Sequence, residues 1–350
     1  MKNKRNVLYS VIIMLAGMMN FAAYSQQKNA TPTAVKKQGP SVSQGPTAIV
    51  RTVKQDKQGN IWIASWQGIF KFDGKAFTNV TAKASSARFF SVLEDRKGNF
   101  WFASVGSGVY YYNGKSIQNF TTKEGLINDR VTTIYEDKTG TIWFGTETGV
   151  SRYNGKSFEN FKMTKAAPIT ADDSVHVSAY QNQLPEDSWM HNDVNAIIEE
   201  KPGRFWLGTR GYATIYDGKK FTTITNKDGK PFTNVRSIIK DKKGTIWLGG
   251  ADGLWRYDGK TFTNLNRKFV GYVYEDKKGD IWTSSESAGG KGWVLSRYEA
   301  QSLSAKKPVV TEVVSKPMIF GILEDTKGNI WFGDFDGVHR YDGKTITDFK

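Results

Sequence analysis

The chain contains no cysteine, only three histidines and only nine prolines in 350 residues. Without cysteine it can form no disulfide, no thiolate metal site, no cysteine nucleophile and no lipid-modified cysteine. The stability of the fold must therefore come from side-chain packing alone. Long apolar runs are scarce as well, since only a segment near the N-terminus approaches the length of a membrane span.

That N-terminal segment has the pattern of an export signal. A basic start (residues 2–5) precedes an apolar stretch (residues 7–23), and Ala23 and Ser25 supply the small residues of a cleavage site. A membrane anchor would need about 20 uninterrupted apolar residues, whereas polar and small residues interrupt this stretch. We therefore predict a signal peptide over residues 1–25, a periplasmic or secreted protein, and no membrane span after signal removal.

Residues 26–46 consist mostly of Gln, Lys, Thr, Pro, Ser and Gly, with almost no large apolar side chain. Such a composition favours a flexible linker, because it cannot bury enough apolar surface to offset the entropy of folding. The remaining residues, 47–350, are predicted to form one globular domain.

Glycine and aromatic residues are abundant, with 35 glycines and 13% aromatics, and they follow a repeat. In the third copy, Asp137 precedes a glycine turn, an apolar triplet around Trp143, a further glycine and aromatic, and then Asn154-Gly155-Lys156. A repeat of about 40 residues with four short strand-like runs is typical of propeller blades. We therefore predict an all-β fold, a seven-bladed β-propeller of four-stranded antiparallel blades. The seven repeat tryptophans are Trp62, Trp101, Trp143, Trp206, Trp247, Trp282 and Trp331.

Connector length predicts the strand order within a blade. The Asp-x-x-Gly and Asp/Asn-Gly-Lys turns are short enough only for hairpins, so the connector between copies must cross the blade. The inner strand of the third copy is then the run over residues 131–137, and the tryptophan strand follows it. Because the apolar triplets do not alternate with polar residues, we expect the tryptophans to pack between blades. Each blade is one continuous stretch, and packing of blade one on blade seven closes the ring.

The charge of the chain is strongly positive, with 49 Lys and Arg against 34 Asp and Glu and a formal net charge of +15. Nucleic acid is the first partner that such a charge suggests. The lysines, however, recur once or twice in each blade, in the turns, instead of clustering. We therefore predict a solvated rim of lysines and no nucleic-acid binding.

The blade motif resembles the two-component regulator propeller repeat, which occurs in periplasmic sensor regions of bacterial hybrid histidine kinases. The resemblance covers residues 48–350, and the chain ends directly after the predicted last outer strand. It implies an exported protein that binds a ligand or partner without a kinase of its own. The expected partner is a small molecule, a glycan or a protein, and a monomer is expected.

The strand order also predicts a binding face. Hairpin turns lie on one face, while the connectors between blades and the turns after the tryptophan strands lie on the other, with irregular segments at residues 163–193, 286–291 and 299–317. Variable loops on a rigid scaffold commonly hold binding residues. Tyr272 and Phe320 are expected near the channel mouth on this second face. The predicted ligand-binding residues are Trp66, Arg88, Phe89, Arg130, Glu147, His191, Asp193, Arg210, Asp252, Glu286 and Asp334.

Two other functions remain open from the sequence. Streptogramin B lyases are seven-bladed propellers that use a Glu-x-His pair with a metal ion, but none of His176, His191 and His339 stands two residues after a glutamate. We therefore predict no catalytic residue, no metal site and no cofactor, and favour a binding protein over an enzyme. A structural cell-surface interaction protein is the second alternative.

Overall fold

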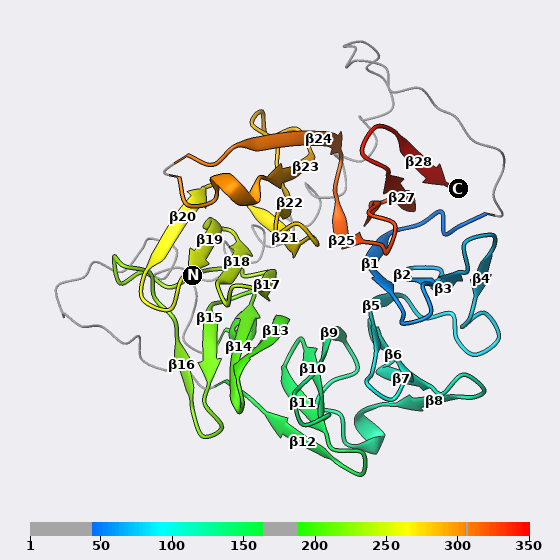
Figure 1. Cartoon of the computed structure of the whole chain (residues 1–350). Coiled ribbons are helices and arrows are strands. Elements are labelled where there is room, and N and C mark those ends of the chain that lie inside the picture. The colour runs from blue at the N-terminus through cyan, green and yellow to red at the C-terminus, as the bar shows by residue number, and fades with distance from the viewer. Residues whose placement is uncertain (1–43, 164–187, 306) are drawn as a thin grey trace, which may run out of the picture. The chain divides into compact units, whose positions relative to one another are not determined.

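The computed structural model describes residues 44–163, 188–305 and 307–350, and their strands form seven four-stranded antiparallel sheets. In each sheet the strands follow chain order from the centre of the ring outward (Figure 1). The predicted seven-bladed propeller and its strand order are therefore confirmed. The predicted signal peptide (1–25) and most of the predicted linker (26–46) lie outside the described residues.

Every blade contains an inner strand, a tryptophan strand, a third strand and an outer strand, and three short 3₁₀ helices occur between strands in the described ranges. The inner strands are β1 (Val50–Gln55), β5 (Phe89–Glu94), β9 (Val131–Glu136), β13 (Val194–Lys201), β17 (Ser237–Lys240), β21 (Val270–Glu275) and β25 (Phe320–Glu324). The tryptophan strands are β2 (Ile61–Ser65), β6 (Phe100–Ser104), β10 (Ile142–Thr146), β14 (Arg204–Thr209), β18 (Ile246–Gly250), β22 (Ile281–Glu286) and β26 (Ile330–Gly333). The third strands are β3 (Gly68–Phe72), β7 (Val109–Tyr112), β11 (Gly149–Tyr153), β15 (Ala213–Tyr216), β19 (Gly253–Tyr257), β23 (Trp293–Tyr298) and β27 (Val338–Tyr341). The outer strands are β4 (Phe77–Asn79), β8 (Ile117–Phe120), β12 (Phe158–Phe161), β16 (Phe221–Thr223), β20 (Phe262–Asn266), β24 (Val310–Lys316) and β28 (Ile346–Phe349). The 3₁₀ helices are η1 (Thr122–Glu124), η3 (Trp189–Asn192) and η4 (Ala300–Ser302).

Apolar packing between blade one and blade seven closes the ring, as predicted. Val50 and Phe72 of blade one share a buried cluster with Trp331 and Phe349 of blade seven. The rings of Phe72 and Trp331 contact each other across this junction, with their centroids 5.8 Å apart. The amide of Val50 also donates to the carbonyl of Asp334 at 3.0 Å. Within the described ranges each blade is one continuous stretch of chain.

The repeat tryptophans are buried between blades, which confirms their predicted packing role. The indole Nε1 of Trp143 donates to Oδ2 of Asp137 at 2.8 Å, while Oδ1 of the same carboxylate accepts the amides of Thr139 and Thr141. The other six blades repeat the indole–carboxylate bond. In six blades one aspartate therefore satisfies the indole and organises the turn. In blade four, Glu200 accepts the indole of Trp206 and Glu199 accepts the turn amide of Gly203.

The glycine that follows the apolar triplet allows the inner strand of the next blade to lie close to the tryptophan strand. A Cβ atom on Gly145 would lie 2.9 Å from the side chain of Val194 in the next blade. Gly208 faces Val235 in the same way, at 2.8 Å. Any larger residue at these positions would push adjacent blades apart.

A second repeated contact joins neighbouring blades on the face of the hairpin turns, and the sequence did not predict it. The amide of Lys57 donates to Oε2 of Glu94 in blade two at 2.9 Å, and its Nζ donates to the carbonyls of Asp95 and Arg96. We call this contact the turn latch. The prediction of a merely solvated lysine rim is therefore wrong for these lysines. Equivalent amide donors are Arg96, Lys138, Lys242, Lys277 and, onto Gln55 of blade one, Thr326.

Blade six departs from the predicted placement of irregular segments. Residues 299–309 and β24 were expected as a connector on the binding face, but β24 is the outer strand of blade six and pairs with β23. Residues 299–309, with η4, therefore join the third and outer strands and lie on the hairpin-turn face. The cause is a missing Asp/Asn-Gly-Lys turn in this copy, which a longer connector replaces.

Candidate functional site: the mouth of the central channel

Seven residues, one from each blade, line the mouth of the central channel. Each follows the first apolar residue of its inner run, at the end of the connector from the preceding blade. In five blades this residue is the extra residue of a β-bulge. It therefore does not pair with the tryptophan strand, and the bulge changes the direction of its side chain. The seven mouth residues are Arg51, Phe90, Thr132, Asn195, Arg236, Gly271 and Phe320.

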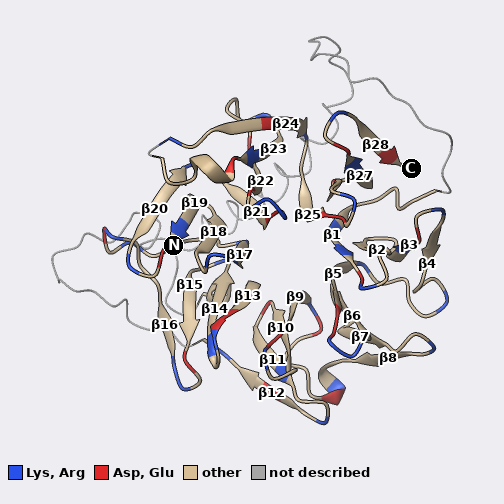
Figure 2. Ribbon diagram, viewed as in Figure 1, with Lys and Arg blue, Asp and Glu red and all other residues tan. Residues whose placement is uncertain are grey.

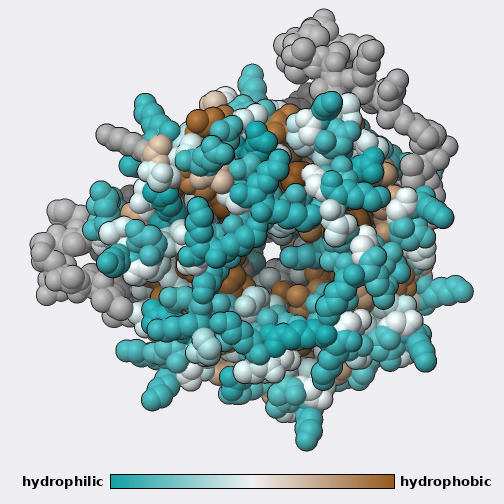
Figure 3. Space-filling model, viewed as in Figure 1, coloured by the Kyte–Doolittle hydropathy of each residue, from teal (hydrophilic) through white to brown (hydrophobic). Residues whose placement is uncertain are grey.

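These residues open into a cavity of about 860 Å³ that is lined by inner strands from all seven blades. Figure 3 shows the opening at the centre of the ring, bordered mainly by hydrophilic residues. The volume is within the range of small-ligand pockets. The mouth lies on the connector face, which is the face predicted to bind.

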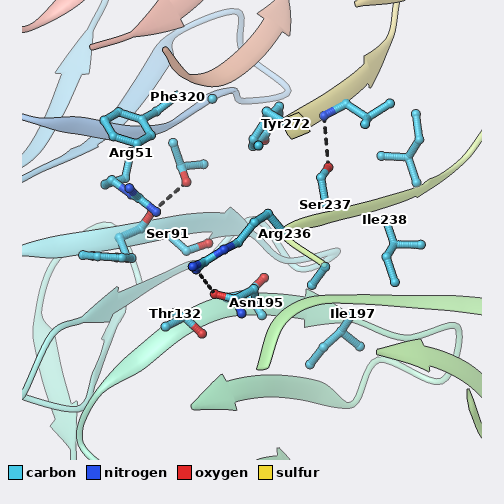
Figure 4. Close-up of a pocket in the computed structure, with 18 of the residues that line it drawn as sticks. Arg51, Ser91, Thr132, Asn195, Ile197, Arg236, Ser237, Ile238, Tyr272 and Phe320 are labelled. Carbon is cyan, nitrogen blue, oxygen red and sulfur yellow. Dashed lines mark hydrogen bonds between the residues drawn. The ribbon is translucent and has the colours of Figure 1, made fainter. Parts of the chain in front are cut away.

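Two arginines enter this cavity from opposite sides of the ring (Figure 4). The Arg51 guanidinium lies between the rings of Phe90 and Phe320, at 4.4 Å and 4.2 Å from their centroids. Arg236 donates from Nη1 to Oδ1 of Asn195 at 3.0 Å. Burial, followed by the nearby charge of Arg236, lowers the pKa of Arg51 to about 10. Arg51 is therefore cationic at neutral pH, and Arg236 lies close enough to act on it electrostatically.

Blade six contributes an aromatic wall beside these cations. Gly271 carries no side chain because the indole of Trp293 occupies its place, 2.8 Å from where a Cβ atom would stand. The ring of Phe269 packs edge-on against Trp293, with centroids 5.5 Å apart. Burial raises the pKa of Tyr272 to about 12, so its phenol stays neutral. The mouth thus combines cations with flat apolar surface.

The carboxylates that line the cavity lie toward its opposite end. Glu136 accepts the amide of Arg96, and Glu199 accepts the amide of Lys138, each from the preceding blade. Both side chains are therefore engaged in turn latches. The mouth end of the cavity remains the cationic end.

Four of the predicted ligand-binding residues, which we call the rim residues, contact one another in two pairs. Arg88 lies over the ring of Trp66, 4.7 Å from its centroid. Nε of Arg130 lies 2.6 Å from the carboxylate of Glu147. The structure therefore brings these four predicted residues together in pairs at the surface of the connector face.

Asp193 and Arg210 form a third pair, which is partly buried. Nε of Arg210 lies 2.8 Å from Oδ2 of Asp193, whose side chain is only 1% exposed. Burial raises the pKa of Asp193, and the charges of Arg210 and Arg236 lower it in part. The Arg210 guanidinium also lies 5.0 Å from the Trp189 ring centroid. Removing Arg210 would leave a buried carboxylate uncompensated, so this arginine supports the rim as well as lining the cavity.

Other predicted residues serve local structure. Phe89 is wholly buried against Tyr110, so its prediction as a ligand contact is wrong, because its side chain points into the core. Asp252 accepts the amide and hydroxyl of Thr233, at 2.6 Å and 2.7 Å. His191 packs against Tyr212, with ring centroids 4.7 Å apart. Glu286 is exposed at the end of β22.

Asp334 belongs to a buried ionic network in blade seven. Its Oδ2 lies 2.7 Å from Nε2 of His339 and 3.2 Å from Nζ of Lys316, and Nδ1 of His339 lies 2.6 Å from Asp348. Burial raises the pKa of Asp334, but the bond to His339 and nearby positive charge outweigh it and bring the pKa to about 2. Burial likewise lowers the pKa of His339, but its bonds to both carboxylates outweigh it and raise the pKa. This network stabilises blade seven at neutral pH.

No group of three or more His, Asp or Glu side chains suited to a metal ion occurs in the described part of the chain. Within the same residues, no helix is long and apolar enough to cross a membrane. His176 lies outside the described residues.

Arg51, Arg236 and the amide of Asn195, which line the same cavity, were not predicted from the sequence. They occupy a variable position of the repeat, directly after the first apolar residue of the inner run. A blade-by-blade alignment of that position would have shown two arginines among Phe, Thr, Asn and Gly. The prediction named Tyr272 and Phe320 near the mouth, and both line the cavity.

The fold and its central cavity define the chain as a seven-bladed β-propeller of repeated four-stranded blades. The family model described as "Two component regulator propeller" matches residues 44–67, 125–148 and 229–252. Each match begins before an inner strand and extends through the tryptophan strand, in blades one, three and five. Blades one, three and five therefore contain the repeat that this family model describes, which confirms the resemblance found in the sequence.

Solved structures with the same fold include a bacterial sensor domain and lyases. The extracellular domain of the hybrid two component system BT3049 from B. thetaiotaomicron is 24% identical with a TM-score of 0.68, over 90% of this chain and 42% of that domain. This chain thus spans less than half of that domain. A streptogramin B lyase is 10% identical (TM-score 0.61; 84% of this chain, 93% of the lyase). Virginiamycin B lyase from Staphylococcus aureus is 13% identical (TM-score 0.62; 86% and 95%). A comparison with curated proteins finds no match.

Proposed function

We propose that the protein is an exported propeller that binds a small polar ligand at the mouth of its central channel. The cavity supports this proposal, because cationic, amide and aromatic groups from different blades converge on it. A site with a few convergent polar groups among aromatic side chains is typical of small-ligand recognition. The family of its repeats, and the likeness to the extracellular domain of a two component system, support a binding role.

The rim pairs belong to the proposed site as its outer layer. Trp66 with Arg88, and Arg130 with Glu147, stand on the connector face around the cavity. We propose that they contact the parts of the ligand that extend out of the channel. The signal peptide, the linker and a monomeric state are proposed from the sequence in the same way.

A thermal-shift screen of small polar metabolites and saccharides tests the proposal. Compounds that raise the melting temperature are then titrated by calorimetry into the wild-type protein and Thr132→Phe. Phe90 and Phe320 show that two other mouth positions accommodate phenylalanine. Because this variant also removes the hydroxyl bonds from Thr132 to the carbonyls of Gly145 and Val194, its melting temperature without ligand is measured first. We expect at least about tenfold weaker binding, roughly 1.4 kcal/mol. Binding that is unchanged in Thr132→Phe would place the ligand elsewhere and contradict the proposal.

A further inference from the structure

We infer that the amine of Lys54, inside the central channel, captures an aldehyde or ketone group of the ligand as a reversible imine. This inference rests on the proposed function, because it specifies the ligand chemistry of the same channel. Lys54 lies on β1 three residues after Arg51, which places it roughly 10 Å further along the strand. Figure 2 shows Lys and Arg distributed over the turns of the blades, as well as on β1 near the centre.

The first support is the position of Lys54 within the repeat. In every blade one residue of the inner strand pairs directly with the repeat tryptophan, and in blade one Lys54 pairs with Trp62. Lys54 is exposed and lines the cavity. The residues at this position in the other six blades are apolar or aromatic and are buried or half-buried: Leu93, Tyr135, Ile198, Ile239, Tyr274 and Leu323. One amine therefore stands in a layer of apolar and aromatic side chains.

The second support is that the amine of Lys54 is free. In the described ranges, no hydrogen bond or ion pair engages its Nζ. Nζ of Lys57, in contrast, donates to two backbone carbonyls of blade two. The carboxylates of Glu136 and Glu199, which line the same cavity, accept backbone amides in turn latches. The Lys54 amine can therefore meet a ligand without first breaking a contact.

The third support is the environment of this amine, because only an uncharged amine attacks a carbonyl group. The side chain is exposed to the channel, yet the surrounding strands displace enough water to lower the pKa of Lys54. Burial is the cause of this shift. The other ionisable side chains that line the cavity are Arg51, Arg210, Arg236, Lys240, Glu136, Glu199, Tyr135 and Tyr272. Desolvated lysine amines are nucleophiles toward carbonyl compounds.

The proposed step balances without an oxidant or a reductant. The lone pair of the neutral Lys54 amine attacks the carbonyl carbon, and the electron pair of the C=O π bond moves to the oxygen. Both amine protons are transferred to this oxygen through water, and it leaves as one water molecule when the C=N bond forms. Leu93 and Ile198 line the cavity in the same layer, so the expected ligand is a small carbonyl compound with an apolar or aromatic part.

Benzaldehyde and benzyl alcohol are matched probes, because only the aldehyde can form an imine. Calorimetric titration should show that the wild-type protein binds benzaldehyde at least about tenfold more tightly than benzyl alcohol. Lys54→Leu should fold, because Leu93 occupies the same position in blade two, and it should lose this preference. Lys54→Arg keeps the positive charge without a nucleophilic amine, so it should lose the preference as well. Lys115→Leu, at an exposed turn lysine, is the matched control and should retain it.

Trapping of the imine locates the reacting amine. Sodium cyanoborohydride reduces the C=N bond to a stable secondary amine, which peptide mass spectrometry assigns to one lysine. We expect the adduct on Lys54 at benzaldehyde concentrations that leave the exposed turn lysines Lys75 and Lys115 unlabelled. Lys54→Arg should lose this adduct.

The inference is overturned if the aldehyde and the alcohol bind the wild-type protein equally or not at all. Labelling of Lys54 that does not exceed labelling of Lys75 and Lys115 would overturn it as well. A compound from the screen that has no carbonyl group and loses affinity in Thr132→Phe would then still support the proposed function. If every compound from the screen also bound Thr132→Phe like the wild type, the inference and the proposed function would be rejected together.

Discussion

The two faces of the propeller differ in how their polar side chains are used. On the hairpin-turn face, one aspartate in each of six blades holds an indole and a turn, two glutamates share these roles in blade four, and most junctions repeat the turn latch. On the connector face, the equivalent positions hold Arg, Phe, Thr, Asn and Gly. The side chains that pack one blade against the next are therefore nearly the same in every blade. The side chains that line the mouth of the cavity differ from blade to blade.

The largest difference in the free energy of unfolding is expected between a tryptophan that packs between blades and a tryptophan on the connector face. Trp143 is 2% exposed between blades, so Trp143→Ala should lower the free energy of unfolding by about 3–5 kcal/mol. Trp66 is only half-buried, under Arg88 on the connector face, and Trp66→Ala should cost far less. Urea unfolding of the two variants measures this, and equal losses would contradict the division between the faces.

The next largest loss of stability is expected from removal of the carboxylate that accepts the indole N–H in each blade. Asp137→Ala leaves the Trp143 indole and two turn amides without their acceptor. We expect a loss of about 2–3 kcal/mol, because buried donors without partners are costly. Asp137→Asn keeps an acceptor oxygen and should lose less. If both substitutions left the unfolding midpoint unchanged, the carboxylate would not organise the turn.

Most of the hairpin-turn face could be predicted from the repeat, whereas the residues at the channel mouth could not. Spacing alone indicated seven blades, their strand order and the packing of residues such as Trp143. The turn latch was missed because it joins Lys57 to a residue 37 positions away, which no local pattern reveals. Arg51 and Arg236 were missed because they stand at a variable position, where the β-bulge decides the direction of the side chain. Phe89 was placed wrongly for the same reason, since it immediately precedes the bulged residue Phe90.

The turn latch itself should have a smaller effect. Oε2 of Glu199 accepts the Lys138 amide at 2.8 Å and Oε1 accepts the Gly203 amide at 3.1 Å. Glu199→Ala should cost about 1–2 kcal/mol, whereas Glu199→Gln should cost under about 1 kcal/mol. The ring already uses a glutamine latch, since Gln55 accepts the Thr326 amide at 2.8 Å. Thermal unfolding that ranks Glu199→Gln below Glu199→Ala would disprove the latch.

The smallest expected effect is the pH dependence of the blade-seven network. The pKa of His339 is raised above its ordinary value of 6.5 in the folded protein. Its contribution to stability is therefore fully present below about pH 6.5 and is lost as the pH rises through the folded-state pKa. Urea unfolding between pH 6 and 9 should show this decline in the wild type, and His339→Gln should flatten it. An identical decline in the variant would assign the pH dependence to another group.

Calorimetric titration of the tightest-binding compound from the screen into two charge-matched double variants tests the functional division of the faces most directly. Arg51→Gln with Arg236→Gln removes two positive charges from the mouth, and Lys57→Gln with Lys242→Gln removes two from the hairpin-turn face. We predict at least about tenfold weaker binding in the mouth variant. The turn variant should bind within about twofold of the wild type but melt at a lower temperature, because the contacts of the two Nζ atoms with backbone carbonyls are lost. Binding that is lost in the turn variant and retained in the mouth variant would contradict the account.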